Sequence, residues 1–75
     1  PLTSLRFWLL GAPDPSAPAT ERLDQAQHLI YLEQRDWQVD YSDYAYSGGQ
    51  WLPGKVSLRR GALRLKLHIA RWHFG

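Results

Sequence analysis

Apolar and polar residues alternate without a break near the end of the chain, from Leu63 to Ile69. Leucine or isoleucine takes every second position there, while Arg64, Lys66 and His68 take the positions between them. Because successive side chains of a β-strand point to opposite faces, this pattern predicts a strand with one apolar and one solvated face. Such strands are typical of an antiparallel sheet that covers something apolar, which is either the chain's own core or a ligand.

Two earlier runs of strand-forming residues, 28–32 and 37–41, predict a first β-hairpin. A connecting loop of two or four residues matches their apolar positions, with Leu32 opposite Trp37. A loop with an odd number of residues would turn one strand's apolar side chains to the solvated face, so an even loop is predicted. The apolar face of this hairpin then holds Ile30, Leu32, Trp37, Val39 and Tyr41.

A tight turn at Arg60-Gly61 predicts a second hairpin, with one strand on each side of the turn. A two-residue turn places Leu58 opposite Leu63, again on one apolar side. Between the two hairpins, residues 44–51 contain two adjacent glycines and predict a mobile loop. The pattern as a whole therefore predicts a mainly β fold, built on a four-stranded antiparallel sheet.

The start of the chain is expected to lie outside this sheet. Thr3 or Ser4 can cap a short helix, and Gly11 can end it. The helical segment is apolar nearly all round, so we expect it to be buried against the apolar face of the sheet. Three closely spaced prolines then predict an extended, unpaired linker. The expected organisation of this single unit is a short helix at 1–11, a linker at 12–24 and the sheet at 25–75.

Composition excludes several functions. The net charge of +2 is too small to indicate nucleic-acid binding. The chain has no cysteine for a disulfide or a thiolate metal site, and His28, His68 and His73 lack the spacing of metal ligands. No serine lies in the sequence context of a hydrolase nucleophile, and no glycine-rich phosphate loop is present. We therefore expect no enzyme activity, no metal and no cofactor.

Aromatic residues are frequent, with four tryptophans and four tyrosines among 75 residues. Trp37 and Tyr41 are interpreted as core residues, with direct contact to a ligand as the alternative. Trp51, beside the glycines, is equally consistent with an exposed anchor for a membrane or a protein partner. The basic residues fall on the face opposite the aromatic ones, which disfavours a stacking platform for single-stranded nucleic acid.

A set of residues in fixed order through the chain carries a family resemblance. Its members are Leu5, Trp8, Gly11, residues 32–41, Tyr44, Leu52-Pro53, residues 63–69 and Arg71-Trp72. This set resembles the C-terminal part of LolB, the outer-membrane receptor for bacterial lipoproteins. The most specific element is the spacing Gln-x-x-Trp-x-Val-x-Tyr-x-x-Tyr, which begins at Gln34. The family usually has glycine where this chain has Asp36, which bears on the type of turn.

The resemblance implies an open β-barrel, an incomplete antiparallel barrel whose concave side is plugged by helices and holds acyl chains. It implies a protein that takes lipoproteins from a periplasmic carrier and delivers them to the inner leaflet of the outer membrane. The family's anchoring cysteine is not in this chain, and its protruding membrane loop is expected outside it too. The implied acyl-chain wall is Ile30, Leu32, Trp37, Val39, Tyr41, Val56, Leu58, Leu65 and Leu67.

Two other functions stay open from the residues alone. The chain could be a small protein-interaction module whose apolar face is only its own core, or a binder of single-stranded nucleic acid. A fragment of a barrel would also leave its last strand at a sheet edge, with Leu63, Leu65 and Leu67 exposed. Two copies could cover that edge, so a homodimer or a pair that exchanges its helices is expected.

Overall fold

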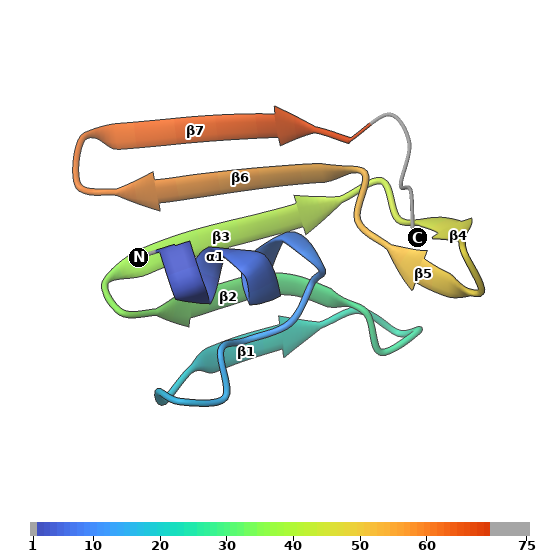
Figure 1. Ribbon diagram of the computed structural model, residues 1–75, viewed down its shortest axis with the longest axis horizontal. Helices are drawn as coiled ribbons and strands as arrows, with labels where there is room; N and C mark the ends of the chain where they lie inside the picture. Colours follow the sequence, from blue (N-terminus) through green and yellow to red (C-terminus); the bar gives the residue numbers. More distant parts are fainter. Residues whose placement is uncertain (1, 70–75) are drawn as a thin grey trace.

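The computed structural model of the protein describes residues 2–69 (Figure 1). Its elements are α1 (Leu2–Leu9), β1 (Thr20–Leu23), β2 (Leu29–Gln34), β3 (Trp37–Ser42), β4 (Ala45–Ser47), β5 (Gln50–Leu52), β6 (Lys55–Arg60) and β7 (Leu63–His68). Five strands form an antiparallel sheet in the order β1-β2-β3-β6-β7, and β4 pairs with β5 alone. The fold is mainly β, as predicted, but its main sheet has five strands and not four.

The additional strand, β1, lies within the segment that was expected to be an unpaired linker. It runs antiparallel to β2, from Thr20 opposite Glu33 to Leu23 opposite Leu29. All four of its residues are exposed, so burial imposes no alternation of apolar and polar positions on them. A prediction from hydrophobic periodicity has no signal to find in such a strand.

The first predicted hairpin is present, but its register differs by two residues from the predicted one. Residues 35–36 form the turn, so Gln34 lies opposite Trp37 and Leu32 lies opposite Val39. Both turn residues have positive φ, 52° and 66°, as a type I′ turn requires. Because a shift of two residues keeps every side chain on its face, the predicted apolar face is correct for Leu32, Trp37, Val39 and Tyr41 although the predicted pairs are not.

The second hairpin shows the same displacement. Its turn is at residues 61–62 and not 60–61, so Leu58 lies opposite Leu65 and Arg60 lies opposite Leu63. Gly61 is the first residue of the turn and has a φ of 58°, which glycine adopts without strain. The apolar side chains of β6 and β7 therefore share one face, as predicted.

The segment predicted to be a mobile loop is a third hairpin, formed by β4 and β5. Tyr46 lies opposite Trp51 across it, and Gly48 and Gly49 form its turn with φ values of 60° and 85°. The pair of glycines is therefore the signal of a type I′ hairpin turn and not of a loop. In Figure 1 this hairpin extends beyond the ends of β3 and β6.

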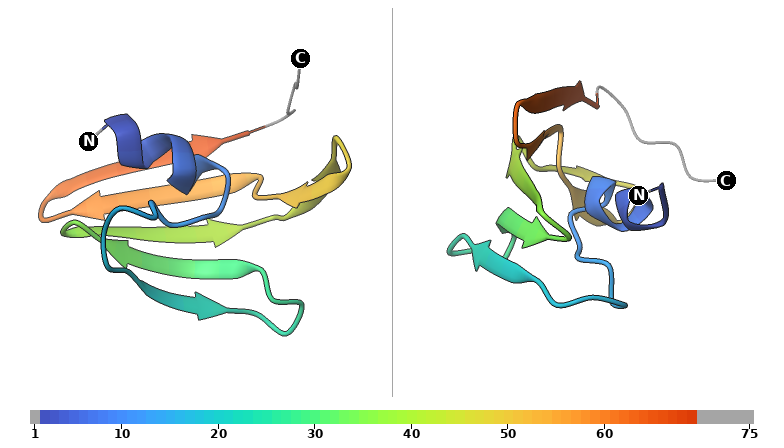
Figure 2. Two further views of the ribbon diagram at one scale, coloured as in Figure 1. Left: turned by 60° about the horizontal axis from the view of Figure 1, so that its bottom comes forward. Right: turned by 90° about the vertical axis from the view of Figure 1, so that its left-hand side faces the viewer.

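Helix α1 packs on the concave face of the curved sheet, as two further views show (Figure 2). The buried apolar cluster between helix and sheet consists of Trp8, Leu29, Leu32, Val39, Tyr41, Val56 and Leu58. The prediction that the helix docks on the apolar face is confirmed. The expectation that it is buried all round is wrong, because Leu2 is 87% exposed and Leu10 is 45% exposed.

The predicted start of the helix is wrong, whereas its predicted end is correct. Ser4 lies inside α1 and is buried, so it does not cap the helix. Gly11 follows the helix with a φ of 78°, in agreement with its predicted role as the residue that ends it. No helix in the described residues is long and apolar enough to cross a membrane. Arg71 and Trp72, which contribute to the family resemblance, lie outside the described residues.

Candidate functional site

The apolar face forms continuous rows across the sheet. Directly paired residues of antiparallel strands share a face, so each row can be followed from strand to strand. One row runs through Leu32, Val39, Leu58 and Leu65, and the next runs through Tyr41, Val56 and Leu67. These seven residues and Trp37 belong to the acyl-chain wall that the sequence predicts, and the structure brings them together on the helix side of the sheet.

The helix covers only part of this face. Leu32, Val39 and Val56 are at most 1% exposed beneath α1, and Tyr41 and Leu58 are buried with them. On β7, in contrast, Leu63, Leu65 and Leu67 are 52%, 48% and 38% exposed. We call these three leucines the open strip. Their exposure confirms the prediction made for them, and it leaves the apolar face half covered by the chain itself.

Ile30 is the one predicted wall residue that the structure places differently. The pairing of β1 with β2 shifts next to it, from Arg22 opposite Tyr31 to Leu23 opposite Leu29. Such a β-bulge interrupts the alternation of a strand. As a result Ile30 is 40% exposed, and Leu29, which the alternation assigned to the other face, is 4% exposed and joins the core.

Trp37 lies at the margin of the covered region. Its ring packs against Trp8 of the helix, with 6.2 Å between the ring centroids and a tilt of 51°. The indole Nε1 of Trp37 is buried and has no hydrogen-bond partner among the described residues. A buried donor without a partner costs about 1–3 kcal/mol, so this N–H is available to a polar group that enters the face.

Two hydrogen bonds join the helix to the sheet below it. The Tyr41 hydroxyl donates to the carbonyl oxygen of Trp8 over 2.6 Å, and Trp8 Nε1 donates to Gln34 Oε1 over 2.8 Å. Burial raises the pKa of Tyr41 well above its ordinary value, with smaller contributions from Tyr44 and Glu21. The Tyr41 hydroxyl therefore keeps its proton, and remains a donor, at any physiological pH.

Gln34 is the centre of the polar contacts that hold the N-terminal segment. Its Oε1 also accepts from the Asp14 backbone N–H at 2.9 Å, and its Nε2 donates to the carbonyl oxygens of Asp14 and Ala17, each at 2.8 Å. Sequence reasoning did not select Gln34 as a functional residue. A signal was present in the sequence, because Gln34 occupies the next apolar-face position after Leu32 and begins the family spacing. In the structure its side chain is 2% exposed.

Asp14 completes this network on the helix side. Its Oδ2 accepts from Ser4 Oγ at 2.6 Å, and its Oδ1 accepts from the backbone N–H and the hydroxyl of Ser16. These hydrogen bonds, that of Ser4 first, lower the pKa of Asp14 to about 2 from an ordinary 3.8, helped by the charge of Arg35 and opposed by burial. Asp14 is therefore a carboxylate that fixes the loop after the helix.

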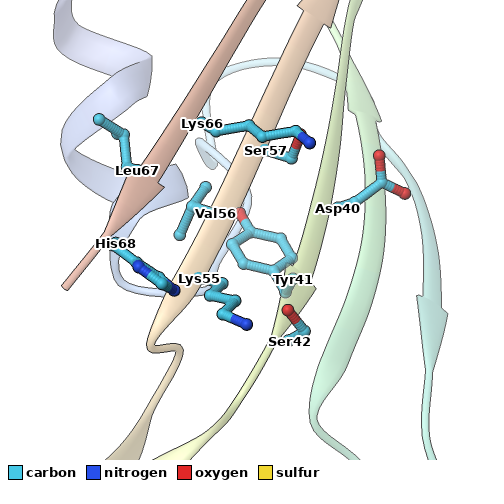
Figure 3. A pocket seen from close by; sticks show the side chains of 9 residues that line it. All are labelled: Asp40, Tyr41, Ser42, Lys55, Val56, Ser57, Lys66, Leu67 and His68. Atoms are coloured by element: carbon cyan, nitrogen blue, oxygen red, sulfur yellow. The ribbon is translucent and has the colours of Figure 1, made fainter. Parts of the chain in front are cut away.

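A hollow of about 570 Å³ lies over β3, β6 and β7 (Figure 3). Its lining residues are Asp40, Tyr41, Ser42, Lys55, Val56, Ser57, Lys66, Leu67 and His68. The strand pairing puts the six polar residues on the face opposite the apolar rows. Two of the charges near it are paired, since Asp40 Oδ2 lies 3.0 Å from Arg59 Nη2 and Lys55 Nζ lies 3.0 Å from Asp43 Oδ2. Tyr41, Val56 and Leu67, however, also belong to the candidate acyl-chain wall, so the hollow and the wall share these three residues.

Metal chemistry finds no support in the part of the chain that is described. No group of three or more His, Cys, Asp or Glu side chains that could hold a metal ion occurs in residues 2–69. The candidate site therefore consists of an apolar sheet face, the helix that half covers it and the polar contacts that hold this helix.

These features define a mainly β domain with an open antiparallel sheet, whose apolar face is partly covered by one short helix. The family model described as "Outer membrane lipoprotein LolB" matches residues 1–72, and the chain belongs to this family. The resemblance noted in the sequence is thereby confirmed.

Curated relatives agree with this assignment. The chain is 42% identical over 76 residues to the outer-membrane lipoprotein LolB of Nitrosococcus oceani, a match that covers 100% of this chain and 38% of the relative. It is 39% identical to the protein of the same name from Pseudomonas fluorescens and 36% identical to that from Pseudomonas aeruginosa, over 96% of this chain and 35% of each relative. The chain thus spans little more than a third of the length of these relatives.

Proposed function

We propose that this chain forms part of an outer-membrane lipoprotein receptor and that its apolar sheet face holds the acyl chains of lipoproteins. In this proposal the complete receptor takes lipoproteins from a periplasmic carrier, works on the periplasmic face of the outer membrane and delivers its cargo to the inner leaflet. It acts by binding and release and not by catalysis, and its cargo is lipid and not nucleic acid.

The observation that carries this proposal is the continuation of the apolar rows past the helix. Leu65 and Leu67 belong to the same rows as the buried Leu58 and Val56, yet nothing in the described residues covers them fully. An acyl chain laid along the open strip would bury methylenes worth about 0.8 kcal/mol each. Such contact has no fixed geometry, so it suits chains of different length and permits release.

The helix would act as a partial lid in this arrangement. Trp8 occupies the part of the face formed by Leu32 and Val39, so deeper entry of an acyl chain requires that α1 move. The hydrogen bonds from Tyr41 and to Gln34 oppose that movement. We therefore propose that acyl chains first contact the open strip and that the covered wall residues follow only when the helix is displaced.

Titration of the chain with a fluorescent fatty-acid probe tests the proposal. The substitutions Leu65→Ser and Leu67→Ser together should weaken probe binding about tenfold, because two half-exposed leucine side chains are lost from the contact. Leu23→Ser is the matched control, since Leu23 is also 47% exposed but lies on β1 at the other edge of the sheet. Its effect should stay within about twofold. Absence of saturable probe binding would refute the acyl-chain wall.

The alternative function is a small protein-interaction module whose apolar face is only its own core. The burial of five predicted wall residues by the chain's own helix favours this alternative. The probe titration separates the two functions, because a closed core takes up no probe.

A homodimer is a further proposal, and it concerns the open strip and the edge of β7. Among residues 2–69 this strand pairs with β6 alone and stands last in the sheet order, so its other edge can accept a strand from a second copy. Light scattering at micromolar concentration tests this. A mass of one chain, 8.7 kDa, at all concentrations would exclude the dimer without affecting the acyl-chain proposal.

A further inference from the structure

The hairpin formed by β4 and β5 lies in a segment without charge. Residues 44–54 contain no Asp, Glu, Lys, Arg or His, although charged residues make up 21% of the chain. The two residues that flank this segment, Asp43 and Lys55, carry opposite charges and pair with each other, with 3.0 Å between Asp43 Oδ2 and Lys55 Nζ. The hairpin therefore ends at its base in a neutralised ion pair.

The exposed face of this hairpin is aromatic. Tyr46 and Trp51 are cross-strand neighbours, with ring centroids 5.6 Å apart in an edge-on arrangement. They are 65% and 53% exposed, whereas Leu52, on the other face of the hairpin, is 2% exposed. The hairpin thus buries Leu52 at its base and turns its two large aromatic side chains to the outside.

The Trp51 ring is contacted from the loop between β1 and β2. Trp51 lies 5.7 Å from the ring of His28, and His28 in turn stacks on Tyr44 at 4.6 Å. The Tyr44 hydroxyl donates to the carbonyl oxygen of Leu29 over 2.7 Å, which ties the start of the hairpin to β2. Because the Trp51 ring already lies against the rings of His28 and Tyr46, it loses less side-chain entropy when it binds a partner.

We propose that the β4–β5 hairpin is a membrane-contact element that inserts Tyr46 and Trp51 into the lipid–water interface. Tryptophan and tyrosine are the side chains enriched at that interface, because each combines an apolar ring with a polar group that stays near water. The absence of charge between Asp43 and Lys55 removes the main penalty for insertion. The glycine turn between the strands adds no side chain that would keep the hairpin tip away from the head groups.

This proposal rests on one part of the proposed function, namely that the protein acts at the outer membrane. It adds a contact between the protein and that membrane. It involves neither the covered wall nor the open strip, since Tyr46 and Trp51 are not part of either. Membrane contact and acyl-chain binding can therefore fail independently of each other.

Sedimentation with neutral phosphatidylcholine vesicles tests the membrane contact on this chain. We expect the chain to bind the vesicles and Trp51→Ser to weaken the partition coefficient at least about tenfold, since the exposed half of a tryptophan is roughly 100 Å² of mainly apolar area and only part of it leaves water at the interface. Leu23→Ser is the matched control, because Leu23 is 47% exposed against 53% for Trp51 but lies on β1, outside both the hairpin and the open strip. The control should change the coefficient by less than about twofold.

Three outcomes would overturn the proposal: no binding to neutral vesicles, an equal loss for Trp51→Ser and Leu23→Ser, or binding that requires anionic lipid and disappears with salt. The second outcome would assign membrane contact to exposed apolar surface in general, and the third to the basic side chains. Binding of the fatty-acid probe by Trp51→Ser should equal that of the parent chain, which separates failure of this proposal from failure of the acyl-chain wall. Circular dichroism of each variant verifies that it is folded.

Discussion

The substitution Gln34→Leu tests whether the buried polar network holds the helix on the sheet. Leucine keeps a side chain of similar bulk on the apolar face but removes every hydrogen bond of the amide. Trp8 Nε1 and the Asp14 N–H lose their acceptor, and the carbonyl oxygens of Asp14 and Ala17 lose their donor. The contacts of the amide with Asp14 and Trp8 are buried, whereas that with Ala17 is only partly buried.

The magnitude follows from these four groups. Each buried polar group left without a partner costs about 1–3 kcal/mol, and the partly buried carbonyl costs less because water can reach it. Some relaxation is expected, so the free energy of unfolding should fall by about 3–5 kcal/mol. A chain of 75 residues has a total stability of roughly 4–11 kcal/mol. Gln34→Leu should therefore remove a large share of the stability although it makes the face more apolar.

Urea unfolding followed by circular dichroism and tryptophan fluorescence measures this loss. Gln38→Leu is the matched control, because Gln38 lies on the same hairpin but its amide makes only an exposed contact of 3.5 Å with the carbonyl oxygen of Asp36. The control should change the free energy of unfolding by less than about 0.5 kcal/mol. A loss below about 1 kcal/mol for Gln34→Leu would refute the reasoning, since it would mean that water or other groups satisfy the network.

Three further predictions concern the same helix and the turn beside the hairpin. Because the pKa of Asp14 is lowered from 3.8 to about 2, its carboxylate favours the folded state above about pH 4, and this contribution disappears as the pH falls toward 2. The urea concentration at the unfolding midpoint should therefore fall less steeply between pH 4 and pH 2 for Asp14→Asn than for the parent chain. Equal slopes for the two chains would contradict this assignment. Tyr41→Phe removes the 2.6 Å hydrogen bond to the Trp8 carbonyl and should lower the free energy of unfolding by about 1 kcal/mol. The same urea assay measures this loss. An unchanged free energy of unfolding would show that this hydrogen bond does not hold the helix. Gly54→Ala should lower the melting temperature and reduce the free energy of unfolding by about 1–3 kcal/mol, because the added Cβ would stand 2.6 Å from the Asp43 carbonyl oxygen. An unchanged melting temperature would mean that the backbone at this turn shifts without cost.

The alternation of residue types predicted the apolar face of this fold correctly except at the β-bulge of Leu29 and Ile30, and it predicted the strand register incorrectly. The pattern of Leu63, Leu65 and Leu67 states which side chains share a face, but it is unchanged when a strand slides by two residues. The turns decide between such registers. At residues 35–36 the decision depends on two non-glycine residues with positive φ, which composition alone does not reveal.

Elements without a buried face of their own were the ones that the sequence could not reveal. Strand β1 is exposed at all four positions, and β4 and β5 are three residues each. The contacts of Gln34 with Asp14 and Ala17 join residues 20 and 17 positions apart, which no local pattern encodes. The sequence did not decide whether Trp51 is a core residue or an exposed anchor. The pairing of β4 with β5 places its ring on the outside of the hairpin.

The position of the polar contacts divides the apolar face into two parts with different properties. Where β2 and β3 form the floor, Gln34 and Tyr41 bind the helix through directional hydrogen bonds, so this part is closed and ordered. On β7, the leucines of the open strip offer apolar contact without any hydrogen-bonding side chain. A receptor that must both hold and release acyl chains needs the second kind of surface, and it needs the first kind to keep its own fold intact while the cargo leaves. The division therefore predicts that substitutions in the open strip change lipid binding at little cost in stability, whereas substitutions at Gln34 change stability first.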